Sequence, residues 1–283
     1  MKLNKKLLAT GVLAASIFAG QAWGAVSAEE AAKLGKSLTP MGAEKSGNGG
    51  TIPAWTGGLT TPPAGYKNDG IYVNPFPNEQ PKFTIDQSNV EQYKDNLSPG
   101  QVAMIERYDD YFMPVYETHR TAAYPQEVME QTVENATEVE LIKGGNGLGN
   151  YQSATPFPIP QNGLEAIWNH ITRYRGGSVQ RNVGQVTPTE GGEFSVVKFQ
   201  DELTWRTYLA DYEPGMDPNV LFYFKQAITA PARLAGNVLL VHETIDQVAE
   251  PRRAWVYNAG QRRVRRAPQV AYDGPGTASD GMR

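Results

Sequence analysis

Four arginines near the end of the chain are the first candidate binding residues. Arg262, Arg263, Arg265 and Arg266 surround a single apolar residue, Val264. A guanidinium group can hold a carboxylate or phosphate through two parallel hydrogen bonds. Because side chains alternate between the faces of a strand, Arg263 and Arg265 share one face. We expect these two to engage an anionic head group or a partner. The alternative is that the arginines pair with acidic residues of the same chain.

Apolar and aromatic residues with regular spacing indicate a second kind of site. They are Trp168, Trp205, Leu209, Phe222 and Phe224. Trp168 lies in a pattern with a helical period, and the other four lie in runs with the two-residue period of a strand. In a half-open barrel covered by the helix, these side chains would line a ligand cavity. A solid core has the same pattern, so the spacing leaves both readings open.

The three histidines form no recognisable catalytic or metal motif. His119, His170 and His242 are far apart, and neither a His-Glu-x-x-His helix nor a Gly-x-Ser-x-Gly elbow is present. His170 on a predicted helix and His242 on a predicted strand are expected to be structural. A hydrolase would need His119 or His242 to be essential. We therefore expect no catalytic residue, metal or cofactor.

Composition excludes several classes of protein. The 283 residues include no cysteine, which removes disulfides, cysteine-ligated zinc and iron–sulfur clusters. A net charge of −4 and a pI near 5.5 argue against a dedicated nucleic-acid-binding protein.

The beginning of the chain is typical of a secretory signal peptide. Lysines within the first six residues precede an apolar run over residues 7–18, and small residues follow. That run is too short to span a bilayer, so we expect no transmembrane segment in the mature chain. We predict a signal peptide over residues 1–24, cleaved after Gly24 or alternatively after Ala28, and a periplasmic location.

The rest of the chain divides into an irregular part and a regular part. Residues 25–97 are rich in glycine and proline and predict an extended arm with short helices, packed against the domain. Residues 98–283 predict one domain together with the arm. It begins with a helix whose N-cap is Ser98 and has further helices over residues 125–136 and 163–174.

After these helices the apolar period changes to that of strands. Seven short runs follow one another, at residues 178–186, 194–199, 203–210, 220–228, 238–245, 254–257 and 261–266. Strands without intervening helices pair antiparallel, and residues 258–260 predict a hairpin turn between the last two. We expect an α+β fold whose curled antiparallel sheet forms an open half-barrel, with helices covering the cavity.

Several segments in order resemble the bacterial domain-of-unknown-function 1329 family. They are residues 38–45, 52–58, 118–123, 156–160, 163–170, 231–236, and 254–258 with 262–268. That family is grouped with the lipoprotein carriers LolA and LolB, which are open β-barrels with helices over a hydrophobic cavity. The resemblance implies the same half-barrel in an exported protein of Gram-negative bacteria. It also implies a role beside a resistance-nodulation-division (RND) exporter. Family members usually continue past the arginine-rich hairpin, so the resemblance implies a C-terminally truncated chain.

These expectations combine into one hypothesis. The protein is a non-enzymatic periplasmic carrier, free or associated with the outer membrane, for a lipid or other hydrophobic molecule. It works with an RND-type exporter or in outer-membrane lipid and lipoprotein handling. Two alternatives are a secreted hydrolase acting on an ester or polymer, and a structural envelope protein with a filled core.

Overall fold

The structure, a computed structural model, describes residues 25–268, 270 and 274–279. The predicted signal peptide lies outside the described residues. The described chain forms two compact units. Residues 138–151 and those from 176 onward form one, here named the sheet unit, and residues 26–137 and 152–175 form the other, the arm unit. The prediction of one domain over residues 98–283 stays a prediction.

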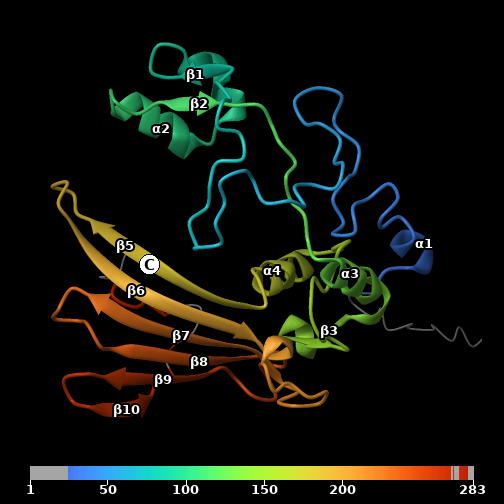
Figure 1. The fold of residues 1–283 in the computed structure, drawn as a ribbon, viewed down its shortest axis with the longest axis vertical. Helices are drawn as coiled ribbons and strands as arrows, with labels where there is room; N and C mark the ends of the chain where they lie inside the picture. The colour runs from blue at the N-terminus through green and yellow to red at the C-terminus, as the bar shows by residue number, and fades with distance from the viewer. Residues whose placement is uncertain (1–24, 269, 271–273, 280–283) are drawn as a thin grey trace, which may run out of the picture. The chain divides into compact units, whose positions relative to one another are not determined.

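A six-stranded antiparallel sheet dominates the sheet unit (Figure 1). Its strands pair in the order β10-β9-β8-β7-β6-β5, so each strand lies beside its neighbour in sequence. They are β5 (Ser178–Pro188), β6 (Phe194–Trp205), β7 (Val220–Ala230), β8 (Val238–Thr244), β9 (Arg253–Asn258) and β10 (Arg263–Arg266). The mixed helix and sheet class and the antiparallel pairing are confirmed, as is the β9–β10 hairpin.

The sheet has one strand fewer than the seven predicted runs. Residues 194–199 and 203–210 were expected as two strands, but β6 continues through the polar residues between them and ends at Trp205. Asp201 is buried there because Arg181 and Gln226 bond to its carboxylate, so the polar stretch does not interrupt the strand. A 3-10 turn, η3 (Arg206–Tyr208), follows. Leu209 therefore lies beyond the strand on which it was predicted.

The six-stranded sheet is not closed into a barrel, since β5 and β10 each pair with one neighbour among the described strands. A separate hairpin of β3 (Glu140–Ile142) and β4 (Gly147–Gly149) belongs to the same unit. A short 3-10 turn, η2 (Lys143–Gly145), joins these two strands. The glycine-rich residues 144–149 thus include the strand β4.

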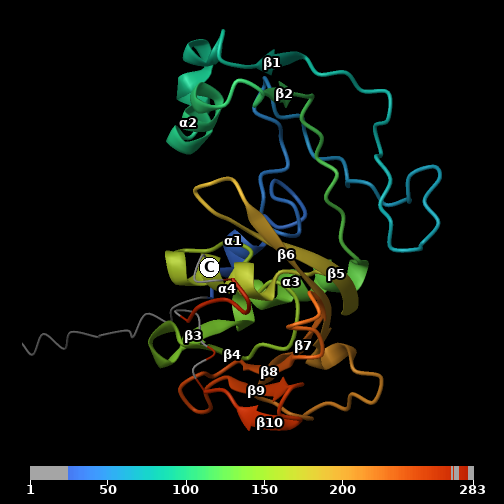
Figure 2. The ribbon, with the colours of Figure 1, turned by 90° about the vertical axis from the view of Figure 1, so that its left-hand side faces the viewer.

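The arm unit holds the helices (Figure 2). They are α1 (Ala28–Ala31), η1 (Val90–Asn96), α2 (Pro99–Arg107), α3 (Gln126–Glu138) and α4 (Gly163–Thr172). The predicted N-cap of α2 is confirmed: Ser98 accepts from the Gln101 amide, and the Gln101 side chain accepts from the Ser98 amide, which completes a capping box. A small core around Ile85, Val90 and Ile105 joins η1 and α2 to the paired strands β1 (Phe83–Ile85) and β2 (Met113–Val115).

Candidate functional site

Strand register places most of the predicted ligand-binding residues on one face of the sheet. Trp205 lies opposite Phe222, and Phe224 lies between Leu203 on β6 and Val241 on β8. Directly opposed partners share a face, so aromatic side chains of β6 and β7 form one row, which Val241 continues on β8. We name it the aromatic face.

The aromatic face is apolar and partly covered. The rings of Trp205 and Phe222 meet edge to face, with centroids 5.3 Å apart. Phe224 packs against a buried cluster of Val241, Ala254 and Ala267. Trp205 is 7% exposed, whereas Phe222 and Phe224 are half-buried, so parts of the two phenylalanine rings remain accessible.

Two buried carboxylates on this face are already paired. Asp201 accepts hydrogen bonds from Arg181 and Gln226 at 3.0–3.1 Å. Glu243, 2% exposed, forms an ion pair with Arg252. Buried charges cost free energy unless they are paired, so these contacts let an otherwise apolar face tolerate two acids.

Arg263 and Arg265 lie at the edge of the same face. Arg265 is opposite Val256 on β9. Val256 is opposite Leu239 on β8, and Leu239 is opposite Gln226 on β7. Strands lie about 4.8 Å apart, so β10 and β7 are separated by roughly 14 Å. Both arginines are exposed, and neither forms an ion pair within the described part of the chain. The alternative reading, that the chain's own acids neutralise them, thus finds no support among the described residues.

The two remaining predicted residues do not lie on these strands. Trp168 is buried on α4, where its carbonyl accepts a hydrogen bond from Thr172, and it belongs to the arm unit. Leu209 is half-buried and follows η3. Their contribution to a ligand site stays a prediction.

The histidines have well-defined neighbours. His119 Nε2 lies 2.8 Å from Glu79 Oε1, and its ring stacks on Phe76 at 3.7 Å. His170 lies 3.3 Å from Arg173 Nη1, which agrees with the expected hydrogen-bonded role. Neither contact brings a hydroxyl nucleophile to the imidazole.

His242 sits on the face of the sheet opposite the aromatic face. It packs between Tyr223 and Trp255, with ring centroids 4.8 and 4.9 Å away. Burial, and after it the positive charge of Arg253, lowers the pKa of His242 below its ordinary value. A neutral imidazole among aromatic rings supports the predicted structural role.

The described residues contain no candidate metal centre and no candidate membrane-spanning helix. No cluster of three or more histidine, aspartate or glutamate side chains able to hold a metal ion occurs in residues 25–268, 270 and 274–279. In that same part of the chain, no helix has the length and apolar character needed to cross a bilayer.

Comparison with known proteins gives the family. Residues 84–283 match the family described as a protein of unknown function (DUF1329). The chain belongs to the DUF1329 family. The predicted family is thereby confirmed. An uncharacterized protein of Pseudomonas aeruginosa, PA3922, is 64% identical over 285 residues. This DUF1329 chain is covered completely by that alignment and spans 63% of the length of the relative. No solved structure matches this chain.

Proposed function

We propose that this DUF1329 protein binds and carries a lipid or another hydrophobic molecule in the periplasm. The ligand's apolar part contacts Trp205, Phe222 and Phe224, and an anionic head group contacts Arg263 and Arg265. The open sheet is one wall of a LolA/LolB-like half-barrel, and Leu209 adds to its apolar lining. An RND-type exporter, or the machinery that handles outer-membrane lipids and lipoproteins, is the partner in transfer.

One observation carries the proposal: aromatic and arginine side chains share a single sheet face. Had the register been shifted by one residue, the arginines would lie with His242 on the opposite face. An apolar surface bordered by exposed positive charge complements a molecule with an acyl chain and an acidic end.

Burial of the apolar chain supplies enough binding free energy without further polar contacts. Removing a methylene group from water contributes about 0.8 kcal/mol, so an acyl chain that buries about ten methylene groups gains roughly 8 kcal/mol before the costs of binding. Half-buried Phe222 and Phe224 provide part of the surface that such a chain would cover.

Palmitate binding tests the proposal directly. Replacing Phe222 and Phe224 by Asp places two charges on the aromatic face and should abolish binding measured by calorimetry. Thr229→Asp is the matched control, since Thr229 is an exposed residue of the same strand β7. Equal palmitate affinity in the double variant and the wild type would sink the assignment.

A further inference from the structure

The arm unit contains a half-open hollow that the sequence did not indicate. We name it the arm pocket. Its volume is about 350 Å³. The lining residues are Thr39, Pro40, Met41, Ala43, Trp55, His119, Arg120, Thr121, Ala122, Tyr124 and Met129. They come from three segments far apart in sequence: the loop at residues 39–43, Trp55, and residues 119–124 with the following helix α3.

Hydrogen bonds within the protein hold these walls in place. Trp55 Nε1 donates to the carbonyl of Ala122 at 2.9 Å, and the Trp55 amide donates to Lys45 at 2.8 Å. Within the loop, the Thr39 amide donates to Ala43 at 2.7 Å, and the Ala43 amide donates to Thr39 Oγ1. A pocket whose walls are ordered in advance loses little entropy when a ligand enters.

Arg120 fixes the arm and does not serve as an anion site. Its Nη1 and Nη2 atoms donate to backbone carbonyls of residues 44, 45, 46 and 53, the shortest of these contacts being 2.7 Å to Glu44. These donors are therefore engaged by the arm. The Trp55 indole N–H is engaged too, so Trp55 offers a ligand only its ring.

His119 is the polar lining residue that we expect to form a hydrogen bond with a ligand. Its Nε2 pairs with Glu79 and its ring is held by Phe76. In the neutral tautomer with the proton on Nε2, this carboxylate contact leaves Nδ1 as a hydrogen-bond acceptor. The pocket thus combines aromatic and methionine surface with a hydrogen-bond acceptor at His119.

Size separates the arm pocket from a lipid site. Its volume is at the lower end of the roughly 300–1,000 Å³ found for ligand pockets. Methionines such as Met41 and Met129 adapt to flat apolar ligands. We propose that the arm pocket binds a compact aromatic molecule that carries one hydrogen-bond donor, independently of the aromatic face of the sheet.

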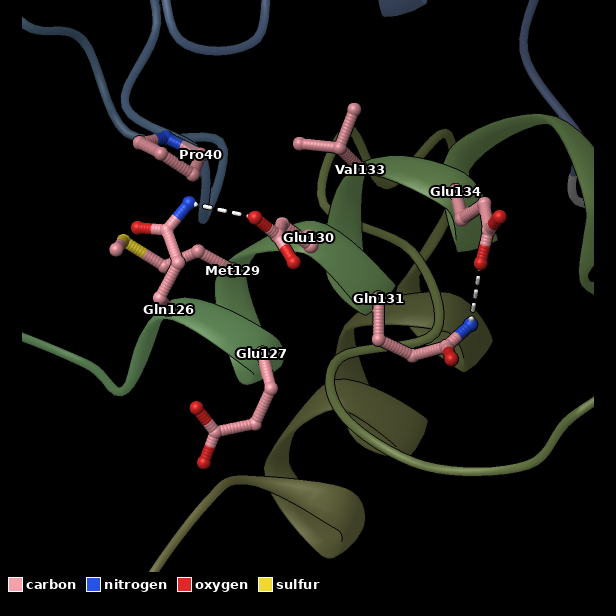
Figure 3. A pocket seen from close by; sticks show the side chains of 8 residues that line it. All are labelled: Pro40, Gln126, Glu127, Met129, Glu130, Gln131, Val133 and Glu134. Carbon is pink, nitrogen blue, oxygen red and sulfur yellow. Dashed lines mark hydrogen bonds between the residues drawn. The ribbon is translucent and has the colours of Figure 1, made fainter.

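A second hollow lies beside the arm pocket along α3 and supplies a position for a matched control variant (Figure 3). It shares Pro40 and Met129 with the arm pocket but continues past Val133 and is lined by Glu127, Glu130 and Glu134. Val133 is one turn beyond Met129 on the same helix and does not line the arm pocket. A tryptophan at either position adds the same bulk to α3.

Calorimetric titration with indole tests the proposal. Indole should bind the whole protein saturably, and N-methylindole, which lacks the donor, should bind several-fold more weakly. Met129→Trp should lower indole affinity at least about tenfold by filling the pocket, and Val133→Trp should leave it unchanged. Ala43→Phe fills the pocket from the loop at residues 39–43 and serves if Met129→Trp does not fold.

The outcomes distinguish this pocket from the sheet site. The proposal is supported if the filling variants lose indole, and it is supported whether or not palmitate binds. Absence of saturable indole binding to the wild type overturns it. Equal indole affinity in the wild type and a folded filling variant also overturns it. Loss of indole on replacing Phe222 and Phe224 by Asp would place the molecule on the sheet instead, and would overturn it as well.

Discussion

Tyr223 on β7 and His242 on β8 are opposed partners whose rings meet edge to face, with centroids 4.8 Å apart. The Tyr223 hydroxyl donates to Asp217 Oδ2 at 2.6 Å. Burial is the largest cause that raises the pKa of Tyr223 to about 12, and this hydrogen bond is the second largest. His242 is therefore held neutral beside a phenol that also stays neutral, which suits a packed part of the sheet.

This packing predicts a pH dependence of stability. Because burial lowers the pKa of His242, the unfolded chain binds a proton near pH 6.5 that the folded chain does not. The free energy of unfolding should fall as pH drops below about 6.5 and level off below the lowered pKa. Thermal unfolding from pH 8 to pH 5 should show a smaller decrease in His242→Gln than in the wild type. An identical pH profile would contradict the role assigned to His242.

The head-group role proposed for Arg263 and Arg265 predicts a selective loss of binding. Replacing both by Ala should weaken palmitate binding by about fivefold to tenfold, the size expected of exposed ion pairs. Binding of hexadecanol, which has the same chain length and no charge, should not change. Arg266→Ala is the control, because Arg266 lies on the opposite face over the Trp255 ring. Equal losses for palmitate and hexadecanol would assign the arginines a structural role.

Arg120 is predicted to anchor the arm. Arg120→Ala removes its hydrogen bonds to four carbonyls and should lower the free energy of unfolding by about 2 kcal/mol. Arg120→Lys should recover little, since an ammonium group cannot span the same carbonyls. Denaturant unfolding measures the difference, with the exposed Arg107→Ala as a control. A stability loss no greater than that of the control would refute the anchoring role.

Gly42 and Gly35 form a matched pair for testing the arm's packing. Both have left-handed backbone angles, with φ of +89° and +76°, so alanine strains both. A Cβ at Gly42 would lie 1.6 Å from the Pro158 carbonyl oxygen, whereas one at Gly35 meets nothing within 4 Å. Gly42→Ala should therefore be the more destabilising variant, by about 2 kcal/mol or more in chemical unfolding. Similar costs for the two substitutions would show that the arm does not pack closely on Pro158.

Local signals in the sequence predicted the regular elements well. The capping pattern at Ser98 located α2, and the two-residue period located the sheet and the hairpin that brings Arg263 and Arg265 to one face. The strand boundary within 200–202 was wrong because Asp201 is buried through long-range bonds to Arg181 and Gln226. The strand propensity of a residue carries no information about its distant hydrogen-bond partners.

The arm pocket could not be predicted for a related reason. Its walls depend on contacts between residues more than sixty positions apart, such as Trp55 with Ala122. Only the expected packing of the arm against the domain pointed that way. Glycine and proline fix local backbone angles, but they do not reveal which distant segment the arm will meet.

The central claim is that the sheet carries a hydrophobic ligand, and native mass spectrometry tests it most directly. The protein is isolated from the periplasm of a Gram-negative host, and anything released by solvent extraction is identified. A stoichiometric lipid or similar hydrophobic molecule is expected on the wild type, and it should be absent when Phe222 and Phe224 are both replaced by Asp. A folded wild-type protein that carries no such molecule and fails to bind added palmitate would contradict the claim.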